Sequence, residues 1–424
     1  VRGHYNIMIS NKIIKIFLIL NLVVLIAGYI IGFDKSFWID EVVSINYGLN
    51  IPSLSLKEIF IQDIHSPFFY YLLFLGQNIL GAISENENFN LYFLRLINIL
   101  GLIPIYYSYL LIKKNEHKVN LSLSIFFLLL ISSNYFFHYV LDLRMYFLLL
   151  GFSLLVNVIN LINTVENENK IAFLLSSILL SILHVYGLVI SMSILVFRFI
   201  KNIFLKDKKK QKIDLIFIVL LLVVFIIFYL PSIHSEANKS NIGWIEINLW
   251  YYRVFIEYTI STLFLIFAAF ILLSWNYKKE ILNRQHINKF FKSNFFYETV
   301  ALASPAIILM IVVLGISFLF FPIIHFRSLI VIFPNLVLYA SILSAFLINK
   351  EKYKIFFTFF LIFLTFINSN YYFKNMINTH ENIEWVLNKT FTKNCSNVPV
   401  YFNDNEKDNL LPLLNDIVLL YSKN

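Results

Sequence analysis

The chain has 424 residues, of which 59% are hydrophobic and only 14% are charged, and its mean hydropathy is +0.74. A soluble globular protein is about a quarter charged, so this composition excludes that class and indicates a protein with many membrane spans. The net charge of +9 does not imply nucleic-acid binding, because excess lysine and arginine marks the cytoplasmic loops of membrane proteins. The single cysteine excludes an internal disulfide framework.

Apolar runs of about 20 residues, the length that crosses a bilayer, recur along the sequence. The first run, Ile13 to Gly32, lacks a small-residue cleavage site after it, so we predict a retained first span and not a signal peptide. The predicted spans are 13–33, 92–112, 119–138, 143–162, 171–185, 187–205, 213–231, 254–275, 299–321, 328–348 and 355–373. Residues 1–372 would form a transmembrane domain, with a first outer loop at 34–91.

The segment 67–80 (PFFYYLLFLGQNIL) is short for a span, and its placement decides the side of every later loop. If it crossed the membrane, the basic run at 206–212 (KDKKKQK) would lie outside. If it lies on the outer surface as an amphipathic helix, the lysine-rich loops fall inside, as the positive-inside rule requires. We therefore predict an all-α polytopic protein with about 11 transmembrane helices, a cytoplasmic N-terminus and an external C-terminus.

The sequence becomes more polar from about residue 373. The run VPVYF at 398–402 has the composition of a short strand, and an apolar stretch follows near 410–421. We predict that residues 373–424 form a small external α/β tail.

Polar residues collect at the predicted outer ends of the spans. Ionisable groups at membrane depth are costly and usually line a cavity or a substrate path. The residues placed on this side are Asp40, Glu41, Asp63, His65, Arg95, Asp142, Arg144, His184, Tyr186, His234, Glu236, Trp244, Arg253, His325 and Arg327. Their shared side predicts an active site at the outer interface.

Asp40 and Glu41 follow an interfacial tryptophan in the stretch FWIDE at 37–41. One interpretation is a solvated pair of loop acids. The other is that one carboxylate acts as a general base on an acceptor hydroxyl, while its neighbour orients it or binds substrate. A base must stay ionised and lie within hydrogen-bond reach of the proton that it removes.

Asp63 and His65 precede Ser66 and Pro67, which suit the cap and first turn of the helix predicted at 67–80. Capping explains Ser66 and Pro67 but leaves the acid and the histidine unexplained. An Asp and a His two residues apart suit either a divalent cation or a sugar hydroxyl. The sequence leaves metal binding open.

Arg144, in the stretch YVLDLRMYF that ends at Tyr146 and Phe147, and Arg327, in FPIIHFRSL, each stand in otherwise apolar text. Each is either a snorkelling arginine, with Asp142 as the partner of Arg144, or a phosphate ligand, because a guanidinium fork matches phosphate oxygens. Two arginines on one face favour an anionic substrate. His184 interrupts two apolar runs, and it is either a satisfied polar group or part of the site.

Short motifs occur along the chain in a distinctive order. They are WIDE (38–41), DIHSPFFYYLLF (63–74), LRL (94–96), LRMY (143–146), HVYG (184–187) and FRS (326–328), which precedes a Phe-Pro pair. Over roughly residues 13 to 350, this series resembles the C-type-fold membrane glycosyltransferases that use a polyprenyl-phosphate-linked sugar. That superfamily includes the protein O-mannosyltransferases and the lipid A aminoarabinose transferases.

The resemblance implies inverting transfer of a sugar from the lipid-linked donor to an acceptor hydroxyl, on the outer face of the plasma membrane. It implies a catalytic base at Asp40 with Glu41 beside it, donor-phosphate ligands at Arg144 and Arg327, and a sugar or acceptor site lined by Asp63, His65, His184 and Tyr146. The late motif reads Arg327-Ser328, where the family usually has Arg-Tyr.

The same resemblance defines the expected partners. The donor is the polyprenyl-phosphate sugar, no separate organic cofactor is expected, and a divalent metal stays an open alternative. The acceptor would be a protein, a lipid or an envelope polysaccharide, and nucleic acid is not expected. The alternative function is a transporter or flippase of lipid-linked glycans. Transporters usually bind near the membrane midplane, whereas the polar residues here lie at the outer ends of the spans.

Overall fold

The structure is a computed structural model. It describes the segments 2–33, 41, 44–45, 47–48, 51–53, 67–84, 93–115, 123–165, 170–204, 206–231, 294–319, 326–348, 358–360 and 362–371. All regular structure in these segments is helical, with no strand among them. The predicted span at 254–275 and the predicted α/β tail at 373–424 lie outside the described residues.

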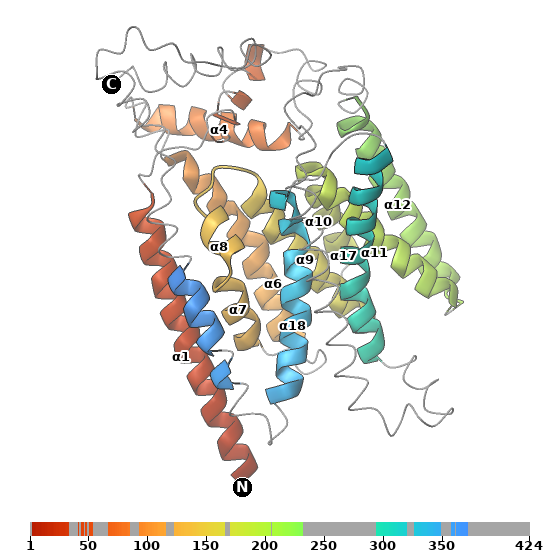
Figure 1. The fold of residues 1–424 in the computed structure, drawn as a ribbon. Helices are drawn as coiled ribbons and strands as arrows, with labels where there is room; N and C mark the ends of the chain where they lie inside the picture. Colours follow the sequence, from red (N-terminus) through yellow and green to blue (C-terminus); the bar gives the residue numbers. More distant parts are fainter. Residues whose placement is uncertain are drawn as a thin grey trace.

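The helices form a bundle, and α4 lies across one of its ends, whereas the N-terminus lies at the other (Figure 1). In chain order the elements are α1 (Arg2–Ile31), η1 (Ile51–Ser53), α4 (Phe68–Ile83), η2 (Leu94–Gly101), α6 (Leu102–Asn115), α7 (Leu123–Ile131), α8 (Asn134–Tyr139), α9 (Tyr146–Val165), α10 (Lys170–Leu183), α11 (Val185–Phe204), α12 (Lys208–Phe228), α17 (Asn294–Leu319), η3 (Phe326–Val331) and α18 (Phe333–Ile348).

Among the described residues, four stretches of helix are long and apolar enough to cross a membrane, which indicates a membrane protein. They are Ile14–Ile31, Leu94–Asn115, Val185–Phe204 and Lys208–Phe228. Shorter apolar helices occupy most of the other predicted spans that the structure describes, at Tyr146–Ile162, Lys170–Leu183, Leu302–Ile316, Leu329–Ile342 and Thr358–Tyr371. The described residues are thus helical, as predicted, and include helices of the length and hydropathy of membrane spans, whereas the count of 11 spans stays a prediction.

The helix predicted over 67–80 is present as α4. Pro67 stands before its first residue with φ −67° and ψ −9°. The ring fixes φ near this value, so the backbone of Pro67 already has the helical conformation. One side of α4 is buried, through Phe69, Tyr70 and Leu73, against a bundle end that includes η2. The opposite side exposes Leu75 and Ile79. This pattern is that of a helix packed on a surface, not of one surrounded by other helices.

The predicted span at 119–138 is interrupted in the structure. α7 ends at Ile131 and α8 begins at Asn134. The Ser133 hydroxyl donates to the carbonyl of Leu130 at 2.7 Å and accepts from the backbone N–H of Phe136 at 3.2 Å. Ser133 therefore caps α8 while satisfying the end of α7, which explains why the chain turns here.

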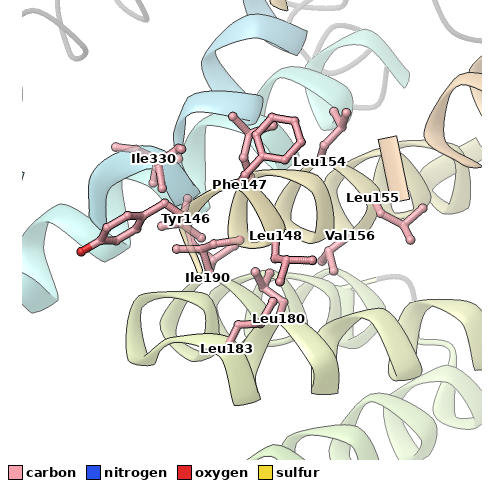
Figure 2. Packing of buried hydrophobic residues seen from close by; sticks show 14 of the residues in the cluster. Tyr146, Phe147, Leu148, Leu154, Leu155, Val156, Leu180, Leu183, Ile190 and Ile330 are labelled. Atoms are coloured by element: carbon pink, nitrogen blue, oxygen red, sulfur yellow. The ribbon is translucent and has the colours of Figure 1, made fainter. Parts of the chain in front are cut away.

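The core is centred on α9, which is buried on all sides and contacts α6, α10, α11, α17, α18, η2 and η3. Figure 2 shows Tyr146, Phe147, Leu148 and Leu154 of α9 among side chains of α10, α11 and η3. Most residues of α9 are apolar, as is expected of a helix at the centre of a bundle. By contrast, α1 and α12 expose long apolar side chains, as helices facing lipid do.

Amide side chains join three helices inside this core. Asn157 of α9 and Asn335 of α18 exchange hydrogen bonds at 2.9 and 2.8 Å, and Asn335 also donates to the carbonyl of Leu302 in α17 at 3.1 Å. The Ser153 hydroxyl donates to the carbonyl of Val331 in η3. Such bonds hold helices together in a setting where water cannot compete. They fix η3, and with it the backbone of Arg327, against α9.

The crossing of α10 and α11 depends on Gly187. A Cβ added there would lie 2.2 Å from the carbonyl oxygen of Leu180, closer than atoms can approach. We expect Gly187→Ala to lower the free energy of unfolding by about 1–3 kcal/mol, because the two backbones must separate. Thermal unfolding of the purified protein in detergent measures the effect.

The matched control is Gly81→Ala in α4, where an added Cβ meets nothing within 4 Å. Alanine is favoured over glycine in a helix, so this variant should be as stable as the wild type or more stable, by up to about 1 kcal/mol. Equal melting temperatures for the two variants would contradict the tight crossing at Gly187.

Candidate functional site

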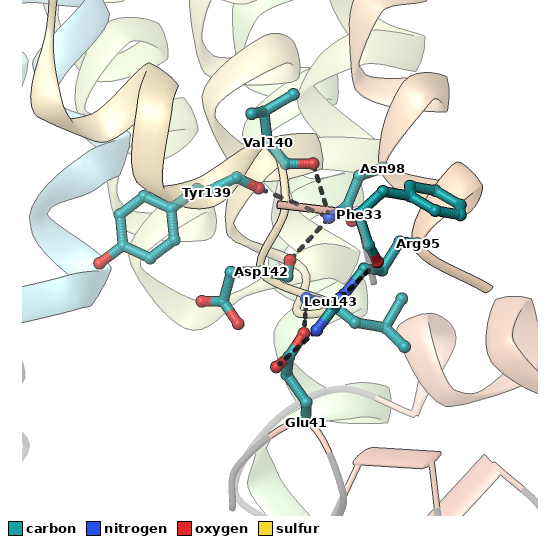
Figure 3. Close-up of polar contacts among 8 residues, drawn as sticks. All are labelled: Phe33, Glu41, Arg95, Asn98, Tyr139, Val140, Asp142 and Leu143. Carbon is teal, nitrogen blue, oxygen red and sulfur yellow. Dashed lines mark hydrogen bonds and ion pairs between the residues drawn. The ribbon is translucent and has the colours of Figure 1, made fainter. Parts of the chain in front are cut away.

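Polar groups from four segments meet at the end of the bundle where α1 ends and α9 begins. The segments are the end of α1, the loop 34–91 that is predicted to be the first outer loop, η2 and the six residues 140–145 between α8 and α9, here called the α8–α9 linker. Figure 3 shows Glu41 and Asn98 both reaching this linker. The linker is mostly buried without being helical, so its backbone polar groups need partners from the protein.

Glu41 and Arg95 form a buried ion pair. The Glu41 Oε2 atom lies 3.6 Å from Nη2 of Arg95, and each side chain is 2% exposed. The other carboxylate oxygen of Glu41 accepts the backbone N–H of Leu143 at 2.7 Å, and Nη1 of Arg95 donates to the carbonyl of Phe33 at 2.7 Å. One carboxylate thus connects the first outer loop to η2 and to the linker, and Arg95 extends this connection to the end of α1 (Figure 3).

Asn98, one turn after Arg95, satisfies the carbonyl groups of the same region. Its amide nitrogen lies 2.7 Å from the carbonyl oxygen of Asp142, 3.2 Å from that of Val140 and 3.5 Å from that of Tyr139. A tight turn follows, in which the backbone N–H of Arg144 donates to the Asp142 carbonyl at 2.7 Å. Asn98 and Glu41 therefore hold the backbone that presents Arg144.

Arg144 is 8% exposed and faces the first outer loop. Its Nη1 donates to the hydroxyl of Ser44 at 2.6 Å, and its guanidinium carbon lies 5.9 Å from the centre of the Tyr146 ring. Tyr146 is buried at the start of α9 and packs at 5.1 Å from the ring of Tyr139. The guanidinium is thus held between a loop hydroxyl and an aromatic face.

His184 is the single residue between α10 and α11, and it is 3% exposed. Its Nδ1 accepts the backbone N–H of Tyr186 at 3.1 Å, and the two rings stand edge to face with centroids 5.0 Å apart. Because Nδ1 accepts, the neutral imidazole carries its proton on Nε2. The residue both caps α11 and presents a donor nitrogen.

The structure brings three of the predicted site residues together in one cluster. Glu41 and Arg144 lie in segments that contact each other, and Tyr146 adjoins Arg144. His184 lies at the α10–α11 junction. For Arg327 the structure describes the backbone in η3 but not the side chain, and Asp40, Asp63 and His65 lie outside the described residues. Within the described segments, no group of three His, Cys, Asp or Glu residues is arranged to hold a metal ion.

Sequence reasoning did not assign three residues that hold this cluster together. Arg95 belonged to the LRL motif, but nothing in the sequence identified Glu41 as its partner. Asn98 and Ser44 received no role. The available signal was a polar residue one turn after Arg95 in an otherwise apolar run, a place where an amide usually satisfies backbone groups.

No protein family, curated protein or solved structure matches this chain.

Proposed function

We propose that the protein transfers a sugar from a polyprenyl-phosphate donor to an acceptor hydroxyl at the end of the bundle that carries the Glu41–Arg95 pair. The observation that carries this proposal is the pairing of two segments. Glu41, the residue after Asp40, binds the backbone of Leu143, and Ser44 of the same loop contacts Arg144. A carboxylate-bearing loop and an arginine suited to phosphate are thus held side by side.

The proposed reaction is a single displacement. Asp40 takes the proton of the acceptor hydroxyl as its oxygen attacks the anomeric carbon, and the bond from that carbon to the phosphate oxygen breaks. The electron pair leaves with the polyprenyl phosphate, and the configuration inverts. Negative charge grows on the phosphate as the bond breaks, so arginines fixed in advance stabilise the transition state more than the ground state.

The contacts of Glu41 support different roles for Glu41 and Asp40. Glu41 already accepts one hydrogen bond and pairs with Arg95 in a buried setting, so we assign it the positioning of the loop. Asp40 then takes the role of base. Arg144 and Arg327 bind the donor phosphate, while Asp63, His65, His184 and Tyr146 line the sugar or acceptor site.

The proposal includes the orientation in the membrane. The chain would have about 11 spans in the plasma membrane, the N-terminus in the cytoplasm, and the active site and the tail at 373–424 outside. The prenyl chain of the donor would lie between spans. The fixed position of η3 against α9 supports a shared phosphate site for Arg144 and Arg327.

A transfer assay on the protein in liposomes, with polyprenyl-phosphate mannose and aminoarabinose as trial donors, tests the function. We expect Arg144→Gln to lower transfer about 10²–10³-fold and Arg144→Lys about 10–100-fold, because lysine keeps the charge but not the fork. The control Ser44→Ala removes the hydroxyl that Arg144 contacts and should lose less than about tenfold.

A transfer rate of Arg144→Gln equal to that of the wild type would rule out phosphate binding by Arg144. If the wild-type protein moved the labelled lipid across the bilayer without forming a product, the flippase alternative would replace the transferase. The melting temperature of each variant, measured alongside, separates loss of chemistry from loss of fold.

A further inference from the structure

A second polar region lies at the opposite end of α11 from His184. α11 and α12 are consecutive helices that both meet the length and hydropathy of a membrane span. Only residues 205–207 join them, so the last residue of α11 and the first residue of α12 lie at the same membrane surface. Whatever side chains this connection carries are therefore held at the boundary between lipid and water.

The connection is densely basic. The lysines at and beside it, here called the basic turn, are Lys170, Lys201, Lys206, Lys208, Lys209, Lys210 and Lys212, and four of them, at 206, 208, 209 and 212, are exposed. Asp207 pairs with Lys210 at 3.1 Å. Hydrogen bonds from the backbone and side chain of Lys210 lower the pKa of Asp207, so this acid stays ionised. Lys170, at the start of α10, also lowers that pKa by its charge.

The backbone of the turn is fixed. The N–H of Lys206 donates to the carbonyl of Ile203 at 3.0 Å, and the N–H of Asp207 donates to that of Asn202 at 3.0 Å. Lys206 has a φ of 57°, the left-handed conformation that commonly ends a helix. Gln211 donates to the same Asn202 carbonyl at 2.9 Å. The lysines thus stand in a defined array and do not form a loose tether.

The other acid of this region is used internally. Asp214 is 1% exposed, pairs with Arg198 at 3.2 Å and accepts from Asn202 at 2.6 Å. Arg198 in turn lies 4.5 Å over the Phe173 ring. This pair joins α11 to α12, so Asp214 faces the interior and does not neutralise the exposed lysines.

An exposed apolar side chain adjoins the lysines. Phe204, the last residue of α11, is 78% exposed, and the preceding Ile203 is 48% exposed. A soluble anion would contact the lysines but would leave this apolar surface exposed to water. A phospholipid can contact both, because its negative headgroup suits Lys206 and its acyl chains suit Phe204. Four to eight basic residues beside a span are the usual signature of binding to anionic lipid.

From this juxtaposition we propose that the basic turn binds the headgroups of anionic phospholipids, with Phe204 against their acyl chains. The inference does not depend on the proposed sugar transfer. The test is a titration of the full chain in detergent with dioctanoyl phosphatidylglycerol, followed by native mass spectrometry. We expect K208Q/K209Q to weaken binding about 25-fold, since each lysine near an anionic surface is worth about fivefold.

The matched control is K113Q/K114Q, which removes two adjacent exposed lysines from the end of α6. It should leave the affinity within about twofold of the wild type. D207N should bind a few-fold tighter, because it removes the acid that pairs with Lys210 while keeping a side chain that can cap α12.

Three results would overturn the proposal. Equal losses for the two double variants would show a general charge effect. Equal binding of dioctanoyl phosphatidylcholine would show that the headgroup charge is not recognised. Binding of glycerol phosphate as tight as that of the lipid would identify a site for a soluble anion, and not for a lipid.

Discussion

Replacing Asp40 with asparagine is expected to lower sugar transfer about 10²–10⁴-fold, the usual contribution of a general base. Asparagine has the size of aspartate but cannot take the proton of the acceptor hydroxyl. Because the donor phosphate is assigned to the arginines, the KM for the donor should change little while kcat falls. Steady-state transfer with varied donor concentration measures both constants.

The control for this experiment is Asp207→Asn, the same chemical change at the cap of α12. Asp207 is a partly exposed cap of α12, and such substitutions usually have small effects, so transfer should stay within about twofold of the wild type. Transfer by Asp40→Asn at the wild-type rate would remove Asp40 from the mechanism.

Glu41→Leu is expected to give the largest loss of stability, about 3–5 kcal/mol, because it leaves the buried charge of Arg95 uncompensated. The N–H of Leu143 loses its acceptor at the same time. Glu41→Gln should cost less, since its carbonyl oxygen can still accept from Leu143. Thermal unfolding of the purified variants in detergent gives the comparison.

The double variant Glu41→Leu/Arg95→Met distinguishes a buried ion pair from two independent contacts. Removing both charges should restore much of the stability lost in Glu41→Leu, as replacement of buried pairs by apolar residues often does. Sugar transfer should nevertheless stay low, because the link from the first outer loop to Leu143 is still missing. Additive losses in the double variant would contradict the coupling of the two residues.

The sequence predicted the helices well where a long apolar run decides the structure. α10, α11 and α9 begin and end within a few residues of the predicted 171–185, 187–205 and 143–162. The prediction failed at 119–138, because hydropathy averages over the pair Ser132-Ser133. A capping serine before Asn134 carried the missing signal, since serine satisfies a helix start and competes with a helix interior.

The site was harder to predict than the helices. Glu41 was predicted as a site acid and Arg95 as one of the polar residues on the same side, so both could be singled out from the sequence. Their pairing could not, because an ion pair depends on how distant segments pack and no local pattern encodes it. The role of Asn98 was hidden for a similar reason, since its acceptors are backbone carbonyls, which every residue carries.

The amide pair of Asn157 and Asn335 has a consequence for biosynthesis. The two residues are 178 positions apart, and at ribosomal rates of about 5–20 residues per second Asn335 emerges about 10–35 seconds after Asn157. During this interval the amide of Asn157 waits in the membrane without its final partner. The carbonyl of Ser153, one turn earlier at 2.8 Å, gives the amide a local acceptor within its own helix. We therefore expect α9 to insert with the Asn157 amide bonded within its own helix. The hydrogen bonds between Asn157 and Asn335 form only after α18 has been synthesised and inserted.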